Sequence, residues 1–97
     1  MRYYVYIIYS KKLDRFYTGT TDDPVRRLAE HNAAFYADTF TVKGIPWQLY
    51  HIICCPSSEI AYKLEAFIKK MKSKAFIERL KNNPEMATDI IQKLLLQ

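Results

Sequence analysis

The chain has 97 residues, of which 49% are hydrophobic, and its formal net charge is +5 at pH 7. This size and composition suffice for one domain with a single core, and no apolar run approaches the roughly 20 residues that cross a bilayer. The positive charge weakly favours a polyanionic partner.

The two cysteines, Cys54 and Cys55, are adjacent. This spacing disfavours a disulfide bond between them and does not match a zinc site. Free thiols and the lack of a recognisable export signal predict a cytoplasmic location.

Two short runs near the amino terminus predict a β-hairpin. Residues 3–9 and 16–20 are rich in aromatic and β-branched side chains, and a polar segment separates them. Because side chains alternate across a strand, the pairing can place Tyr6 beside Tyr17. Packed aromatic rings occur in many ordinary cores, so this pair alone predicts no function.

The next segment has the signals of a helix that begins after Thr21 and ends near Asn32. Thr21 or an aspartate can cap it, and Pro24 suits its first turn. Arg27 and His31 are four residues apart, so they share one face. The helical spacing predicts an inward stripe made of Val25, Leu28 and Ala29.

Residues 33–46 lack a regular period and end at Gly44 and Pro46, which predicts a long loop. Residues 47–54 are aromatic and β-branched, which predicts a third strand.

The strongest helical pattern begins at Ser58 and continues to about residue 72. Its predicted buried face consists of Ile60, Ala61, Leu64, Phe67, Ile68 and Met71. Glu65 lies on the shoulder of this face, where a helix that needed only solubility would not place a carboxylate.

Two further helices are predicted, one capped by Ser73 and the other from about Glu85 to Leu96. We therefore predict an α+β fold of order β-β-α-β-α-α-α, with a small three-stranded antiparallel or mixed sheet flanked by helices. Residues 1–97 would form one domain, with a core at about 3–72 and a helical extension at 73–97.

In chain order, these features resemble the GIY-YIG nucleases. That family has two short motifs on adjacent strands, a helix with an arginine and often a histidine four residues later, and a glutamate on a later helix. The matching residues here are Tyr4-Val5-Tyr6, Tyr17-Thr18-Gly19, Arg27, His31 and Glu65. The most similar branch contains small stand-alone proteins related to the N-terminal nuclease domain of the bacterial excision-repair incision subunit. This branch shares the departures from the family motif at Tyr4, Val5 and Thr18.

The resemblance implies a metal-dependent endonuclease that hydrolyses phosphodiester bonds in DNA, in repair or with selectivity for DNA structure, and RNA is left open. Tyr6 would be the general base, and Tyr17 would orient the water or Tyr6. Arg27 would donate to the phosphoryl oxygens, and His31 would position substrate or share proton transfer. Glu65 would hold one Mg²⁺ or Mn²⁺ ion.

Other residues have supporting roles in this interpretation. Gly19 would allow close approach of the substrate, while Arg26, Lys69 and Lys70 would contact nucleic acid. Some family members also use an asparagine, for which Asn82 and Asn83 are the candidates.

Two alternatives remain open at this stage. The first is a non-catalytic nucleic-acid-binding module of the same fold. The second is an interaction protein that uses the apolar segment Ile90 to Leu96 as a dimer face. We expect the chain to be a monomer or a weak homodimer.

Overall fold

The computed structural model describes residues 2–35 and 39–97. The elements in chain order are β1 (Tyr3–Ser10), β2 (Arg15–Thr21), α1 (Pro24–Asn32), α2 (Thr39–Lys43), β3 (Trp47–Cys55), α3 (Ser58–Met71), α4 (Lys74–Asn82) and α5 (Pro84–Leu95). The strands form one antiparallel sheet in the order β2-β1-β3. The predicted α+β fold class is confirmed, and the sheet is antiparallel rather than mixed. No helix among the described residues is long and apolar enough to span a membrane.

The prediction of a loop over residues 33–46 is wrong in part, because this segment contains the helix α2. Five residues are too few for a 3.6-residue period to show in the sequence. A tertiary contact supports the helix: the indole Nε1 of Trp47 donates to the carbonyl of Thr41 at 2.6 Å. Residues 36–38 of the predicted loop lie outside the described residues.

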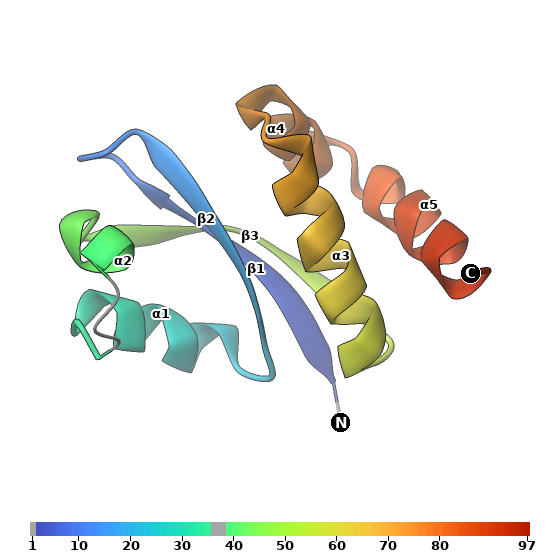
Figure 1. The fold of residues 1–97 in the computed structure, drawn as a ribbon, viewed down its shortest axis with the longest axis horizontal. Helices are drawn as coiled ribbons and strands as arrows, with labels where there is room; N and C mark the ends of the chain where they lie inside the picture. The colour runs from blue at the N-terminus through green and yellow to red at the C-terminus, as the bar shows by residue number, and fades with distance from the viewer. Residues whose placement is uncertain (1, 36–38) are drawn as a thin grey trace.

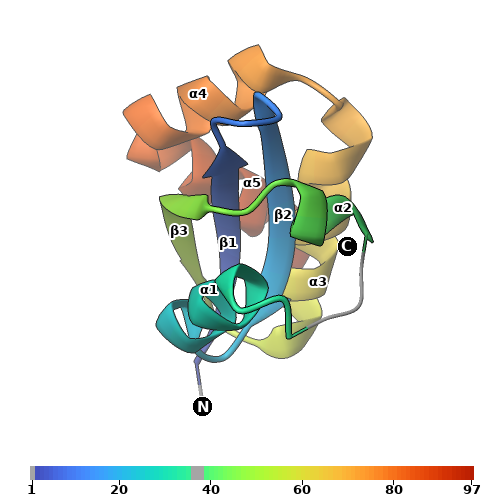
Figure 2. The same ribbon diagram turned by 90° about the vertical axis from the view of Figure 1, so that its left-hand side faces the viewer.

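The sheet separates two groups of helices, with α1 and α2 on one face and α3, α4 and α5 on the other (Figure 1 and Figure 2). Alternation along β1 supplies both cores. On the α1 side, Tyr6 and Ile8 pack with Trp47. On the α3 side, Val5 and Ile7 join a larger cluster.

The helices α4 and α5 share the larger core rather than standing apart from it. Their contribution to that cluster consists of Phe76, Ile77, Leu80, Ala87 and Leu94. Burying each large apolar side chain contributes about 1.5–3 kcal/mol. At the end of α5, Ile90 and Ile91 pack partly against the core, whereas Leu95 and Leu96 are exposed.

The predicted buried face of α3 is correct at four positions and wrong at two. Ile60, Ala61, Leu64 and Ile68 are buried, but Phe67 and Met71 are exposed. The reason is that α3 is covered along one side only, and the ring of Phe67 lies at the margin of that contact, 6.0 Å from the ring of Phe76.

Candidate active site

Helix α1 turns a polar side toward the sheet instead of its predicted apolar stripe. Val25 is 73% exposed and Ala29 is also exposed, whereas His31 is only 4% exposed. The predicted stripe is therefore wrong except for Leu28, which packs against the core on this face. Helix α1 therefore buries an imidazole on this face, while two of the aliphatic side chains predicted there face solvent.

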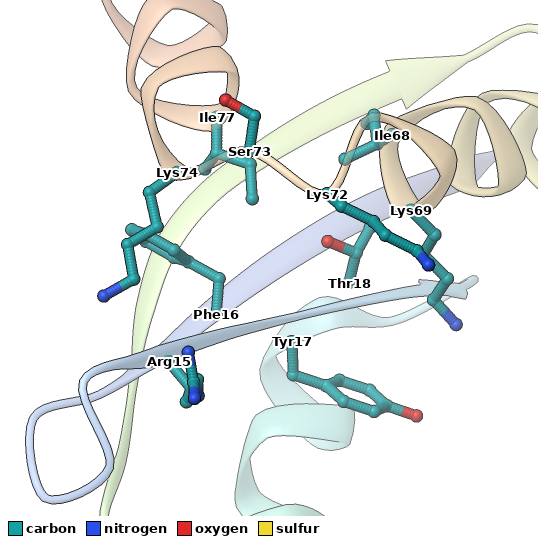
Figure 3. Close-up of a pocket in the computed structure, with 10 residues that line it drawn as sticks. All are labelled: Arg15, Phe16, Tyr17, Thr18, Ile68, Lys69, Lys72, Ser73, Lys74 and Ile77. Atoms are coloured by element: carbon teal, nitrogen blue, oxygen red, sulfur yellow. The ribbon is translucent and has the colours of Figure 1, made fainter.

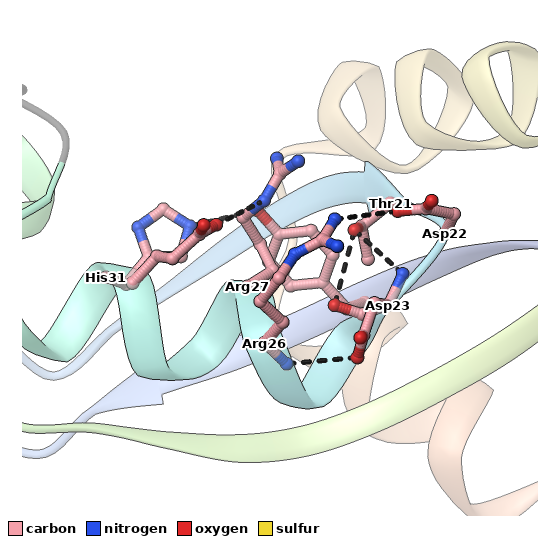
Figure 4. A network of polar contacts seen from close by, with 8 residues as sticks. Thr21, Asp22, Asp23, Arg26, Arg27 and His31 are labelled. Carbon is pink, nitrogen blue, oxygen red and sulfur yellow. Dashed lines mark hydrogen bonds and ion pairs between the residues drawn. The ribbon is translucent and has the colours of Figure 1, made fainter.

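The start of α1 sets this orientation. The side chain of Asp23 caps the helix by accepting from the Arg26 amide at 3.1 Å, and Pro24 occupies the first turn. Thr21 accepts from the Asp23 amide at 3.0 Å, which ties the helix start to the end of β2 (Figure 4). Strand β2 thus leads directly into α1, which packs on the sheet face that carries Tyr6.

Tyr6, Tyr17 and His31 form an aromatic cluster on this face. In the register of β1 and β2, Tyr6 pairs with Gly19, so Tyr17 lies diagonally across from it. The ring centroids of the two tyrosines are 6.4 Å apart, and those of Tyr17 and His31 are 5.2 Å apart. The Tyr6 hydroxyl and His31 Nε2 are hydrogen bonded at 3.0 Å. The structure therefore brings together these three residues of the predicted site.

Gly19 provides the space for the Tyr6 ring. A Cβ placed on Gly19 would lie 2.6 Å from Cε1 of Tyr6 and closer still to its hydroxyl. The glycine does not have a positive φ, so the requirement is for space and not for an unusual backbone conformation. Gly19 thus has a structural role beneath Tyr6, in addition to any part in the substrate approach predicted from the sequence.

Tyr6 is a poor candidate for the general base in this conformation. Its side chain is 2% exposed. Burial, followed by the neighbouring Tyr17, raises the pKa of Tyr6, and the charge and hydrogen bond of Arg27 only partly oppose this. A phenol that holds its proton this tightly is neutral at pH 7, which suits a hydrogen-bonding role toward His31.

Arg27 lies beside this cluster on α1. Its Nε is 3.3 Å from Oε1 of Glu30, and both side chains are about a quarter exposed, at 28% and 24%. Figure 4 shows the guanidinium directed along the sheet face, beyond the helix backbone. A planar, permanently charged donor that is largely withdrawn from water yet still accessible is suited to bind phosphoryl oxygens.

Glu65 reaches the site from the opposite layer. Because α3 packs on the opposite face of the sheet from Tyr6, the four predicted residues Tyr6, Tyr17, Arg27 and Glu65 do not all come from one face. Strand β2 is at the edge of the sheet, so side chains from both layers can meet around it. The Glu65 charge also raises the pKa of Tyr6, although burial and Tyr17 have larger effects.

Two contacts hold the Glu65 carboxylate at this edge. Thr20 Oγ1 donates to Glu65 Oε1 at 2.7 Å, and Lys69 Nζ lies 2.9 Å from Oε2. The same ammonium lies 5.5 Å from the centroid of the Tyr17 ring. Lys69 therefore connects the carboxylate on one side of β2 with the aromatic cluster on the other.

Thr20 and Asn32 are site residues that the sequence did not reveal. Thr20 looked like an ordinary strand residue, although its alternation opposite Gly19 points it toward the helix layer that carries Glu65. Asn32 looked only like a helix stop. Its side chain bonds both backbone groups of Trp47, at 2.6 and 3.0 Å, and so fastens the end of α1 to β3.

The remaining predicted residues lie outside this cluster. Arg26 forms an exposed ion pair with Asp22 at 2.9 Å, and Lys70 is exposed on α3. Asn82 and Asn83 lie at the junction of α4 and α5, on the opposite face of the sheet from Tyr6 (Figure 1). Their predicted roles stay predictions.

The donor set around Glu65 fits one kind of metal ion. Within residues 2–35 and 39–97, no group of three or more histidine, cysteine or acidic residues could hold a metal. Mg²⁺, however, commonly takes one or two carboxylates and completes its shell with water and substrate phosphates. Glu65, with a side chain 20% exposed, fits an ion that is shared with a substrate.

Comparisons with known proteins agree with this geometry. The family model described as the GIY-YIG catalytic domain matches residues 2–81. A UPF0213 protein from Syntrophus aciditrophicus is 37% identical over 82 residues, which cover 84% of this chain and 93% of that protein. A UPF0213 protein from the potE 3' region of Serratia liquefaciens is 38% identical over 73 residues, covering 75% and 70% of the two chains. The solution NMR structure of the UPF0213 protein BH0048 from Bacillus halodurans is similar with a TM-score of 0.52 and 32% identity, covering 91% of this chain and 94% of that one.

Proposed function

The chain belongs to the GIY-YIG family, and from that premise we propose that it is an endonuclease that hydrolyses phosphodiester bonds in DNA with one Mg²⁺ or Mn²⁺ ion. One observation carries the proposal: Tyr17, Lys69 and Glu65 are in contact around the edge of β2. The cluster of Tyr6, His31 and Arg27 adjoins this edge on the α1 side. This arrangement offers cationic, phenolic and carboxylate groups to one phosphate.

In the proposed reaction, a water attacks phosphorus and gives a proton to a base while the bond from phosphorus to the leaving oxygen breaks. The leaving oxygen takes up a proton, and the phosphoryl oxygens gain negative charge in the transition state. Arg27 donates planar N–H groups to these oxygens as the charge develops. Because the guanidinium is partly withdrawn from water, its hydrogen bonds to a charged oxygen are stronger than in bulk solvent.

Glu65 would hold the divalent ion, and Thr20 would orient its carboxylate. When bound, Mg²⁺ or Mn²⁺ would supply a Lewis acid that neutralises charge on the substrate phosphate. Lys69 pairs with Glu65 in this structure. When substrate binds, the Lys69 ammonium would leave Glu65 and pair with a phosphate oxygen instead.

We assign the contact with the attacking water to Tyr17 rather than Tyr6. Tyr17 is half-buried and lines an open pocket, whereas the Tyr6 hydroxyl is buried against His31. Tyr6 then acts as a positioning residue that fixes the imidazole. The replacement Tyr17→Phe should lower kcat more than Tyr6→Phe does. If Tyr6→Phe lowered kcat more, Tyr6 would be the residue that contacts the attacking water and acts as its base.

A nicking assay tests the proposed function. Supercoiled, linear and branched DNA are incubated with Mg²⁺, Mn²⁺ or EDTA, and the branched substrates also test whether the nuclease is structure-selective. Glu65→Gln should abolish nicking. Its control is Glu59→Gln, the same substitution at an exposed position of the same helix, which should retain nicking. For Arg27→Gln, the matched control is the exposed Arg79→Gln. Nicking that persists in both site variants would refute the assignment.

The alternative is a nucleic-acid-binding module without catalysis. The ion pair between Glu65 and Lys69 favours it, because a carboxylate occupied by an ammonium is not yet available to a metal. In that case the purified wild type would bind DNA with strong salt dependence, would not nick it with either metal, and would bind equally well as Glu65→Gln.

A further inference from the structure

A second feature lies next to the candidate active site. The edge of β2 and the junction between α3 and α4 enclose a pocket of about 310 Å³ (Figure 3). The residues lining it are Arg15, Phe16, Tyr17, Thr18, Ile68, Lys69, Lys72, Ser73, Lys74 and Ile77. Two of them, Tyr17 and Lys69, also belong to the candidate active site, so the pocket and the site are continuous.

The pocket carries a concentrated positive charge. Four cationic side chains line it, from Arg15, Lys69, Lys72 and Lys74, and no acidic residue is among the described residues that line it. Lys69 and Lys74 have ion-pair partners outside the lining, Glu65 and Asp14.

Arg15 and Lys72 differ from the other two cations. Within the described parts of the chain, neither of them has a carboxylate within ion-pair distance. Cations that line one concave surface without an ion-pair partner raise its positive potential, which favours the binding of an anion there. The pocket is therefore chemically suited to bind a phosphate.

The backbone at Lys72 supports a role for its side chain. This residue ends α3 in the left-handed conformation, with φ 47° and ψ 43°. Glycine is the usual residue at such a helix end, because it has no side chain to strain the backbone. Here a lysine takes the position, and its side chain runs along the pocket toward Lys69 (Figure 3).

Ser73 also lines the pocket, and its Oγ accepts from the Phe76 amide at 3.1 Å and so caps α4. Figure 3 shows this hydroxyl directed toward α4 rather than into the pocket, so the positive charge of the described lining residues comes from the four cationic side chains alone.

We propose that this pocket binds a backbone phosphate of the DNA strand that is cleaved, away from the scissile phosphate. The inference rests on the proposed function, since it takes the strand to pass Glu65. Glu65 and Lys72 are seven residues apart on α3, or about 10 Å at 1.5 Å per residue. Each strand of duplex DNA has one phosphate per 3.4 Å of helix axis, so a duplex that lies parallel to α3 would span about three nucleotides over this distance. Lys69 lies between the two ends of this path.

Binding in EDTA tests the pocket without requiring catalysis. A fluorescent DNA duplex is titrated over a series of salt concentrations with the wild type and with the double variant Arg15→Gln/Lys72→Gln. Loss of one phosphate contact should reduce the slope of log K against log salt by about 0.9. The control Arg79→Gln/Lys93→Gln removes the same charge from exposed positions that do not line the pocket and should leave the slope near that of the wild type.

The outcomes separate this inference from the proposed function. Equal slopes for the pocket variant and the control would refute phosphate binding in the pocket. Wild-type protein that does not bind DNA would refute it as well. If the pocket variant alone loses slope but the wild type never nicks DNA with Mg²⁺ or Mn²⁺, the pocket stands and the nuclease proposal fails. If the wild type nicks DNA and the pocket variant keeps both the wild-type slope and KM, the nuclease proposal stands and the pocket fails.

Discussion

The exchange Gly19→Ala gives the sharpest test of how the site is built. Two effects with opposite signs act at this position. Alanine in a strand interior should stabilise the protein by about 0.5–1 kcal/mol relative to glycine, through the lower entropy of the unfolded chain. The new methyl group, however, would lie 2.6 Å from Cε1 of Tyr6, which is 0.8 Å short of the 3.4 Å at which ordinary contact begins.

The steric effect should win. Tyr6 is 2% exposed and hydrogen bonded to His31, so its ring cannot move without disturbing the cluster. Overpacking of this kind typically costs about 1–3 kcal/mol. We therefore expect a net destabilisation of about 1–2 kcal/mol, and a fall in Tm of about 4–8 °C per kcal/mol for a domain of this size.

A double-mutant cycle with Tyr6→Leu assigns this cost to the contact. Leucine removes the ring that meets the new methyl group, so Gly19→Ala should be neutral or stabilising in that background. Urea unfolding of the four proteins should give a coupling energy of about 1–3 kcal/mol.

Two results would contradict the reasoning. Gly19→Ala that is as stable as the wild type would show that the glycine does not make space for Tyr6. If that stable variant also lost nicking activity, the glycine would serve the approach of the substrate, as the family resemblance implied. Purely additive free energies in the cycle would place the cost elsewhere in the sheet.

Four further predictions concern the Glu65 carboxylate and the buried thiol and phenol of Cys55 and Tyr6. Thr20→Val keeps the side-chain shape but removes the donor to Glu65; we expect about tenfold weaker Mn²⁺ binding by calorimetry, and unchanged affinity would exclude an orienting role. Lys69→Met should strengthen Mn²⁺ binding in the absence of DNA, because the ammonium competes with the metal for Glu65. The same variant should weaken DNA binding in EDTA, because it loses a cation that would pair with a phosphate. If both affinities changed in the same direction, the proposed change of partner by Lys69 would be wrong. Burial raises the pKa of the Cys55 thiol from 9.0 to about 11. The free energy of unfolding that the neutral buried thiol contributes is therefore fully present below pH 9 and is lost as the pH rises through about 11. The unfolding free energy should fall over this range, less so in Cys55→Ala, and identical curves for the two proteins would refute the assignment. The pKa of Tyr6 is raised as well, so Tyr6→Phe should reduce the loss of stability above pH 10.

Local patterns in the sequence were enough for most of the fold. The hairpin, the third strand and the four longer helices follow from side-chain alternation, helical periodicity and capping residues, each of which acts within a few positions along the chain. The same patterns failed for α2, which is shorter than two turns, and for the orientation of α1.

The ordered set of Tyr6, Tyr17, Arg27, His31 and Glu65 could be chosen from the sequence, because their residue types and order resemble one family. Their geometry could not. The contacts that build the site join residues 25 positions apart in the case of Tyr6 and His31, and 45 apart in the case of Thr20 and Glu65.

Tertiary packing decided which side of each helix faces the sheet, and through this the chemistry of the site. It buried Tyr6, which raises its pKa and moves the proposed contact with water to Tyr17. It also placed Glu65 on the far layer, within reach only because β2 is an edge strand. Backbone periodicity records which residues share a face, but which face is covered depends on segments distant in the sequence. This is why candidate residues could be chosen from the sequence, while their arrangement around the sheet edge required the folded structure.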